Sequence, residues 1–222
     1  MNRRSLALIL FLATLACGAA AGPSSQVAWD RETLELLASG DAARGQQLAG
    51  QCGSCHGSEG TSPSPNWPSL AGQLPTYLYK QLKDYKDGNR QDALMSALVG
   101  NLSDQDMADL AAFYASQPLP PAKPSGDEAA TKLVKIGDGQ RLIPACNSCH
   151  GRSGQGNRVL ERDIATMPAL TGQFPAYLEK TMLDYKSGKR GNDVYRRMRA
   201  ITEQLTEAEI KALSEYYGTL AN

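Results

Sequence analysis

The chain has 222 residues with 23 Lys and Arg against 23 Asp and Glu side chains, so its formal net charge at neutral pH is zero. This balance argues against a nucleic-acid-binding protein, whose phosphate partners demand a strongly basic face. The length suits one or two domains, and each of two domains would bury only a modest hydrophobic core.

The N-terminal segment has the features of a secretory signal peptide. Met1 to Arg4 carry two positive charges, residues 5–16 form a short apolar run, and residues 19–21 are alanines suited to cleavage. The run is too short for an ordinary membrane span, although an uncleaved anchor is the alternative. Cleavage after residue 21 leaves 21 basic and 23 acidic side chains. We therefore expect a slightly acidic periplasmic protein.

Cys17 lies inside this segment and is the odd one of the five cysteines. We interpret it as a residue that is discarded with the signal peptide. The alternative is lipid attachment, which is disfavoured because Thr14 occupies the position where such signals usually have leucine.

The rest of the chain is a duplicated module. "GQQLAGQCGSCHG" (45–57) aligns with "GQRLIPACNSCHG" (139–151) at an offset of 94 residues. "SLAGQLPTYLYKQLKDYKDGNR" (69–90) aligns with residues 169–190, and "LSDQDMADLAAFY" (102–114) aligns with residues 205–217. Between the copies, residues 116–130 contain four prolines and predict a semi-extended linker. The predicted division is a signal peptide (1–21), a first domain (22–117), a linker (118–130) and a second domain (131–222).

Each module is predicted to be helical. One helix follows Pro75 or Pro175 and stops at a glycine, because proline favours the first helical position and glycine the end. Another begins at Ser103 or Thr206, each of which has an acidic residue three positions on, a variant of the capping box. We also expect a helix leading into each heptapeptide and one at residues 30–39. No run reads as a strand, so the chain is predicted to be all-α with long loops.

The duplicated heptapeptides "QCGSCHG" and "ACNSCHG" carry the chemistry. They place two cysteines and a histidine together in each module: Cys52, Cys55 and His56, then Cys146, Cys149 and His150. This spacing lets two sulfurs form thioethers with the vinyl groups of one haem, while the histidine ligates its iron. The alternatives are a disulfide framework, a redox-active pair or a zinc site. Zinc ribbons have their cysteine pairs about 15–20 residues apart, whereas 90 residues separate Cys55 from Cys146.

The second iron ligand is indicated by elimination. The chain has only two histidines, both already used, so bis-histidine ligation within the chain is excluded. Among the methionines, only Met95 and Met198 match between modules, since each precedes the capping residue of the last helix by eight positions. They are the predicted axial ligands, with core packing as the alternative. Imidazole and thioether together suit electron transfer rather than catalysis at iron.

Further residue pairs match between the modules. Carbonyls near Pro68 and Pro168 are candidates to orient the ligand histidines, although a simple turn role is equally compatible. Tyr85/Tyr185 and Arg90/Arg190 are candidates to bind haem propionates; the alternative is a core tyrosine and a solvated arginine. The glycines after the ligands, Gly57 and Gly151, are expected to let the backbone turn tightly.

"CGSCHG" and "CNSCHG", together with "LAGQLPTYLYKQLKDYKDG" and "LTGQFPAYLEKTMLDYKSG", resemble the di-haem cytochrome c4 family over nearly the whole chain after the signal peptide. The resemblance implies two tandem cytochrome c-like domains, related by a pseudo-twofold axis and joined by the proline-rich linker. It implies two covalently bound haem c groups, on Cys52, Cys55, Cys146 and Cys149, with iron ligands His56, Met95, His150 and Met198.

The family resemblance also implies a function. Members carry electrons in the periplasm from a quinol-oxidising cytochrome complex to terminal oxidases, often in loose association with the membrane. An alternative from the class of enzyme subunits is the di-haem partner of a larger dehydrogenase, as in flavin-linked sulfide oxidation. A third hypothesis, a peroxidase-like enzyme, requires an open or exchangeable iron position. Three arginines close to Met198 predict that the two haems differ in reduction potential.

Overall fold

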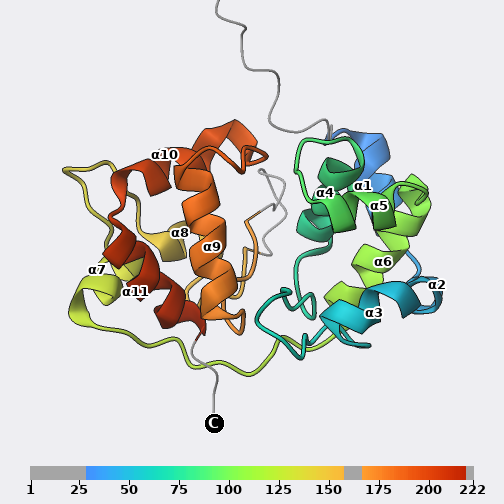
Figure 1. Cartoon of the computed structure of the whole chain (residues 1–222), viewed down its shortest axis with the longest axis horizontal. Helices are drawn as coiled ribbons and strands as arrows, with labels where there is room; N and C mark the ends of the chain where they lie inside the picture. The colour runs from blue at the N-terminus through green and yellow to red at the C-terminus, as the bar shows by residue number, and fades with distance from the viewer. Residues whose placement is uncertain (1–28, 158–166, 219–222) are drawn as a thin grey trace, which may run out of the picture.

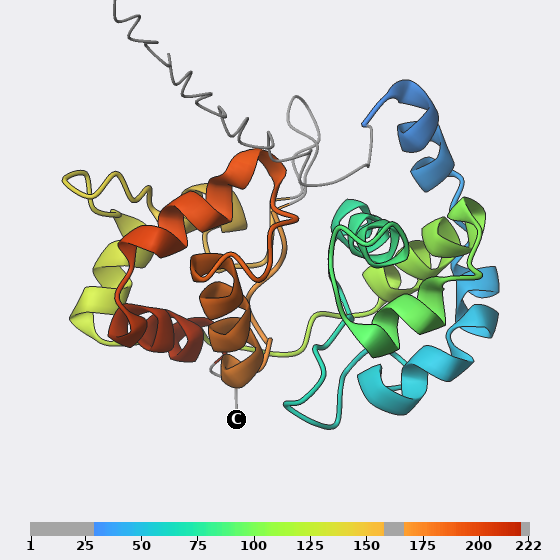
Figure 2. The same ribbon diagram turned by 45° about the horizontal axis from the view of Figure 1, so that its top comes forward.

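The computed structural model describes residues 29–157 and 167–218, and the predicted signal peptide with Cys17 lies outside them. Within the described ranges the protein is mainly helical, and an isolated β-bridge joins Asp138 to Ile143. Figure 1 shows two helical modules side by side, with the linker running along the lower edge between them, and Figure 2 shows the same two modules from another side. The predicted all-α fold with two tandem modules is confirmed. None of the described helices is long and apolar enough to cross a bilayer.

The first module contains the helices from α1 to α6. Their bounds are α1 (Arg31–Ala38), α2 (Ala42–Leu48), α3 (Gly50–His56), α4 (Pro75–Lys86), α5 (Ala93–Val99) and α6 (Asp104–Ser116). The second module repeats most of this order. Its elements are α7 (Glu128–Lys135), α8 (Cys146–His150), α9 (Pro175–Lys186), the 3₁₀ helix η1 (Val194–Arg196), α10 (Arg197–Gln204) and α11 (Glu207–Gly218).

The helix starts follow local chemistry, as predicted. Pro75 and Pro175 occupy the first turn of α4 and α9, where the missing N–H leaves no bond unmade. At α6 the Ser103 side chain accepts from the Asp106 N–H and the Asp106 side chain accepts from the Ser103 N–H, which completes a capping box. Thr206 and Glu209 form the same reciprocal pair before α11.

The helix predicted to lead into each heptapeptide is found in the first module, whereas in the second module the preceding helix ends well before the heptapeptide. In the first module α2 runs almost directly into α3. In the second module α7 ends at Lys135, and residues 136–145 form a turn closed by the Asp138–Ile143 bridge. Gly137 has a positive φ of 82°, and Pro144 lacks the N–H that a helix interior uses, so the helix does not continue. Asp127 caps α7, so this helix begins within the last residues of the segment 118–130 that was predicted as the linker.

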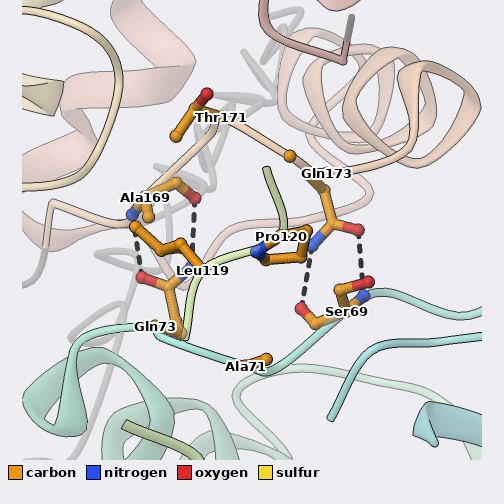
Figure 3. Close-up of a pocket in the computed structure, with 9 residues that line it drawn as sticks. Ser69, Ala71, Gln73, Leu119, Pro120, Ala169, Thr171 and Gln173 are labelled. Atoms are coloured by element: carbon orange, nitrogen blue, oxygen red, sulfur yellow. Dashed lines mark hydrogen bonds between the residues drawn. The ribbon is translucent and has the colours of Figure 1, made fainter. Parts of the chain in front are cut away.

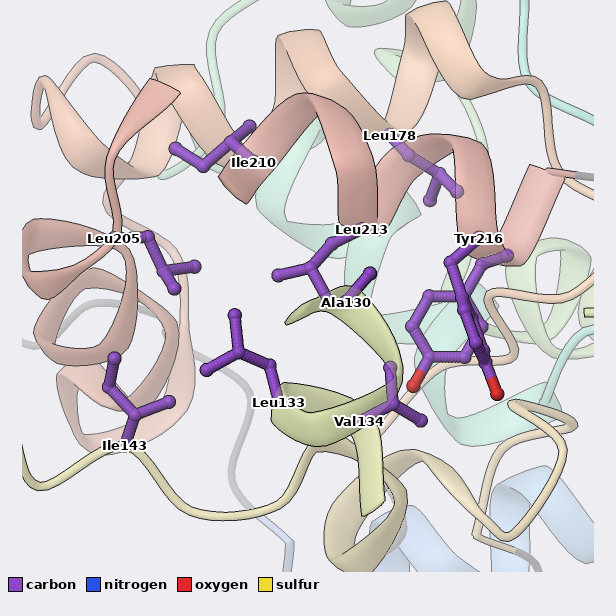
Figure 4. Packing of buried hydrophobic residues seen from close by; sticks show 10 residues of the cluster. Ala130, Leu133, Val134, Ile143, Leu178, Leu205, Ile210, Leu213 and Tyr216 are labelled. Atoms are coloured by element: carbon purple, nitrogen blue, oxygen red, sulfur yellow. The ribbon is translucent and has the colours of Figure 1, made fainter. Parts of the chain in front are cut away.

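Each module has its own hydrophobic core. In the first, α6 supplies Met107, Leu110 and Phe113, which pack with Leu78 of α4. In the second, α11 supplies Ile210 and Leu213, which pack against residues of α7 and α9 (Figure 4). Full burial of such a side chain contributes about 1.5–3 kcal/mol. The cores therefore hold the long helices in place and leave the short α3 and α8 to carry the functional histidines.

Candidate functional site

His56 is the last residue of α3, and its side chain is 6% exposed. Its Nδ1 donates a hydrogen bond to the carbonyl of Pro68 at 2.8 Å. This bond fixes the ring orientation and leaves Nε2 free to bind a metal. Burial lowers the pKa of His56, which favours the neutral form that a metal requires.

His150 has the same arrangement at the end of α8. It is 8% exposed, and its Nδ1 donates to the carbonyl of Pro168 at 2.9 Å. Burial also lowers its pKa. The expectation that carbonyls at the two prolines orient the histidines is confirmed in both modules.

The four cysteines of the heptapeptides are half-buried, and no disulfide joins them. Within the described residues, no three Cys, His, Asp or Glu side chains converge as ligands for a metal ion.

Gly57 and Gly151 end the two histidine helices with φ of 81° and 85°. A Cβ at Gly57 would overlap the carbonyl of Thr61, and one at Gly151 would come within 2.8 Å of the Gly156 carbonyl. Both positions need glycine, as predicted, because the chain turns sharply directly after each histidine.

Met95 lies in α5 and Met198 in α10, both partly buried. The Met95 N–H donates to the Asp92 side chain at 3.0 Å, which places it in the first turn of its helix. Before Met198, Tyr195 and Arg196 both adopt left-handed backbone angles, with φ of 55° and 56°. Adjacent left-handed residues without glycine are strained, and such strain gathers at functional sites.

The histidine helix and the methionine helix of each module do not pack substantially on each other. Instead α5 packs on α4 and α10 on α9, whereas α3 follows α2 and α8 packs on α7. A flat prosthetic group between imidazole and thioether requires such a separation. The axial roles of Met95 and Met198 stay a prediction.

Two of the other methionines, Met107 and Met182, pack in the hydrophobic cores. Met107 is fully buried in the first core, as is its counterpart Ile210 in the second. Met182 packs against the second core, and its counterpart Leu82 packs against the first.

The matched arginines and tyrosines lie at the interface between the modules. Arg90 stacks over the ring of Tyr85 and Arg190 over Tyr185, each at 4.6 Å from the ring centroid. Each arginine also donates to a tyrosine hydroxyl of the other module at 3.1 Å, Arg90 to Tyr177 and Arg190 to Tyr77. These reciprocal contacts are those of a pseudo-twofold pair.

The alternative interpretation of a solvated arginine is wrong for Arg190, which is buried. It is 5% exposed, and its Nη1 is buried without a hydrogen-bond partner. A buried guanidinium nitrogen without an acceptor fits a carboxylate-bearing group such as a haem propionate. Burial raises the pKa of Tyr177, but the charges of Arg90 and Arg190 outweigh this and lower it to about 8. The two arginines therefore bring positive charge into the interface, which suits an anionic group beside Arg190.

The arginines near Met198 are partly neutralised. Arg196 pairs with Glu203 at 2.8 Å and Arg199 with Asp193 at 2.6 Å, while Arg197 lies over the ring of Tyr195. The local positive charge is therefore smaller than the sequence indicated. Unequal haem potentials stay a prediction.

Sequence reasoning gave no role to Gln73, Gln81 and Gln173. The Gln81 side-chain oxygen accepts from Arg90, Arg190 and Asn192 at 2.8–3.0 Å and thus joins the modules. Gln73 and Gln173 bond across the interface to backbone groups beside Pro168 and Pro68. The one signal in the sequence was the recurrence of "GQ" in both modules.

Two all-helical modules, each with a buried histidine oriented through Nδ1 and two half-buried cysteines in the same Cys-x-x-Cys-His segment, define a tandem c-type haem protein. The cytochrome c family profile matches residues 42–117 and 136–221. Cytochrome c4 of Pseudomonas aeruginosa is 44% identical over 81% of this chain and 88% of its own length. The chain belongs to the cytochrome c4 family of di-haem electron-transfer proteins, and it binds two covalent haem c groups.

One further comparison concerns the fold, and another concerns a relative that is described by a different role. The crystal structure of reduced cytochrome c4 from Pseudomonas stutzeri superposes with a TM-score of 0.74 at 38% identity, over 82% of this chain and all of that chain. A protein of Thiomonas intermedia described as a thiosulfate dehydrogenase electron acceptor is 34% identical over 76% of this chain and 77% of its own.

Proposed function

We propose that this protein works in the periplasm, carries electrons from a quinol-oxidising cytochrome complex to a terminal oxidase, and associates loosely with the membrane. The observation that carries the proposal is the presence of two equivalent sites in one chain, each with a buried histidine held by a proline carbonyl, in modules that contact each other reciprocally. Similarity to cytochrome c4 over both modules supports it, and the signal-peptide pattern of residues 1–21 supports the location.

The proposed site residues are those that the sequence indicates. Cys52 and Cys55 hold one haem and Cys146 and Cys149 the other; His56 with Met95, and His150 with Met198, bind the irons. When bound, haem supplies reversible one-electron oxidation and reduction. The prolines' carbonyls hold each histidine in one tautomer. The arginines at the interface offer charge-assisted hydrogen bonds to propionates.

A second candidate function is electron acceptor for a periplasmic dehydrogenase. The similarity to a relative described as a thiosulfate dehydrogenase electron acceptor favours it. Both functions use the same haem sites, so they differ only in which donor reduces the protein.

Comparing the two electron donors separately distinguishes the two proposed functions. Oxidised holoprotein is mixed with a quinol-oxidising complex and quinol, or with a thiosulfate dehydrogenase and thiosulfate, and haem reduction is followed by visible absorbance. Membranes with a terminal oxidase then report reoxidation. Fast reduction by quinol and fast reoxidation support the carrier. Reduction by the dehydrogenase alone rejects it in favour of the second function.

A further inference from the structure

A single peptide group stands between each ligand histidine and the opposite module. The Pro68–Ser69 peptide accepts the His56 Nδ1 proton on its oxygen at 2.8 Å. Its N–H, that of Ser69, donates to Oε1 of Gln173 in the second module at 3.0 Å. The two hydrogen bonds lie at opposite ends of one amide.

The second module repeats this arrangement. The Pro168–Ala169 peptide accepts from His150 Nδ1 at 2.9 Å, and the Ala169 N–H donates to Oε1 of Gln73 in the first module at 2.8 Å. Each histidine is thus connected, through one amide, to a glutamine of the other module.

Each glutamine is held in place by further bonds. The Gln173 amide donates back to the Ser69 carbonyl at 2.9 Å, and the Gln73 amide donates to the Ala169 carbonyl at 3.0 Å (Figure 3). Each Oε1 also accepts the N–H of the residue that follows it, Leu74 or Phe174. Both side chains are nearly buried, at 7% and 8% exposed. Water does not compete for these bonds, so their geometry is fixed.

A peptide whose N–H donates a hydrogen bond becomes a stronger acceptor at its oxygen, because the two bonds polarise the amide in the same direction. A stronger acceptor at Nδ1–H makes the imidazole a more basic ligand, as second-shell partners of metal-bound histidines do. A more basic ligand stabilises oxidised iron. Donation from the Ser69 N–H to Gln173 therefore lowers the reduction potential of the iron bound by His56, and donation from the Ala169 N–H to Gln73 does the same for the iron bound by His150.

We propose that Gln73 and Gln173 are reciprocal positioning residues, each of which orients the ligand histidine of the opposite module and sets the potential of that module's haem. The inference rests on the proposed ligand roles of His56 and His150. It predicts that an alteration of the glutamine in one module changes the reduction potential of the iron in the other.

The test uses Gln173→Met and Gln73→Met in the full holoprotein, with exposed Gln140→Met as the matched control. An NMR-detected redox titration follows His56 and His150 separately, together with hydrogen exchange of each Nδ1 proton. For Gln173→Met we expect a rise in the first-module midpoint, equivalent to about threefold to tenfold in the reduction equilibrium and so at most about 59 mV. Exchange at His56 should quicken while His150 stays unchanged. Gln73→Met should give the mirror result, and Gln140→Met neither.

The inference is overturned if a variant shifts the midpoint potential of the iron in its own module. It is also overturned if the variant shifts both midpoints equally or shifts neither. Gln173→Glu, which keeps an acceptor oxygen but loses the amide donor, provides a second test should the methionine variant not fold. It should leave the first-module midpoint at or below the wild-type value, and a rise contradicts the proposed polarisation. If His56 did not bind the iron, its NMR signal in the wild type would not change between the oxidised and reduced protein. If only the inference about the glutamines fails, that change is still observed.

Discussion

Lys80 and Asp84 form an ion pair one turn apart on α4 that is almost completely buried, at 2% and 0% side-chain exposure. The Lys80 ammonium also donates to the Asn192 carbonyl of the second module at 2.5 Å, and the Asn192 amide donates to Asp84 at 2.7 Å. The matching pair in the second module, Lys180 and Asp184, is 66% and 18% exposed. The same Lys–Asp pair therefore lies in the interface in the first module and is largely exposed to solvent in the second.

Replacing Lys80 with methionine should destabilise the protein by about 3 kcal/mol, because it leaves the Asp84 carboxylate buried without its cation. Asn192 still donates a hydrogen bond to Asp84. We therefore expect the loss to lie at the lower end of the roughly 3–5 kcal/mol that breaking a buried ion pair costs. The matched change Lys180→Met should cost no more than about 1 kcal/mol, since that pair is exposed. Denaturant unfolding of both holoproteins measures the difference. Equal losses would show that burial at the interface contributes nothing to the pair.

Replacing both Cys52 and Cys55 with serine should remove one covalent haem, because a hydroxyl group forms no thioether with a vinyl group. Mass spectrometry of the denatured protein should find one haem instead of two, and the Cys146→Ser, Cys149→Ser variant should give the same mass change. Two haems retained on either variant would contradict the assignment of the cysteines.

Replacing Met95 with leucine should remove about half of the near-infrared sulfur–iron absorption and lower the potential of the first haem, because methionine ligation raises it. Met107→Leu is the matched control, since Met107 is 0% exposed in the core and the swap preserves volume. A control with an altered band, or a Met95 variant with an intact one, would remove Met95 from the ligand set.

The Arg141–Glu209 pair should make stability depend on pH in the acid range. Hydrogen bonds from Arg141 lower the pKa of Glu209 from 4.5 to about 2, against a smaller effect of burial. A carboxyl whose pKa is lower in the folded state stabilises the protein above pH 4.5, and this contribution is lost as the pH falls towards 2. Glu209→Gln keeps a capping side chain before α11 but removes the charge.

Thermal unfolding of the holoprotein therefore should show Glu209→Gln less stable than the wild type at pH 7, with the difference shrinking at pH 3. A difference that stays constant between these pH values would show that the charge of Glu209 is not what stabilises α11.

Much of the functional site was readable from the sequence, because each part of it is encoded within one short element. Spacing places the Cys52, Cys55 and His56 group on one turn, and the duplication separates Met95 from core methionines such as Met107. Proline and capping pairs mark the helix starts for the same reason. The turn before Cys146 was missed, because it depends on how Gly137 and the Asp138–Ile143 bridge close a loop.

The sequence by itself determined the duplication, the helices and the residues able to hold two haems, since these follow from local spacing along the chain. Only the tertiary structure decided that Lys80 is buried and Lys180 exposed, that each arginine reaches a tyrosine of the other module, and that Gln73 and Gln173 connect to the opposite histidines. Matching residues in a repeat share their local structure but not their neighbours, and burial and hydrogen bonding depend on what the other module brings into contact.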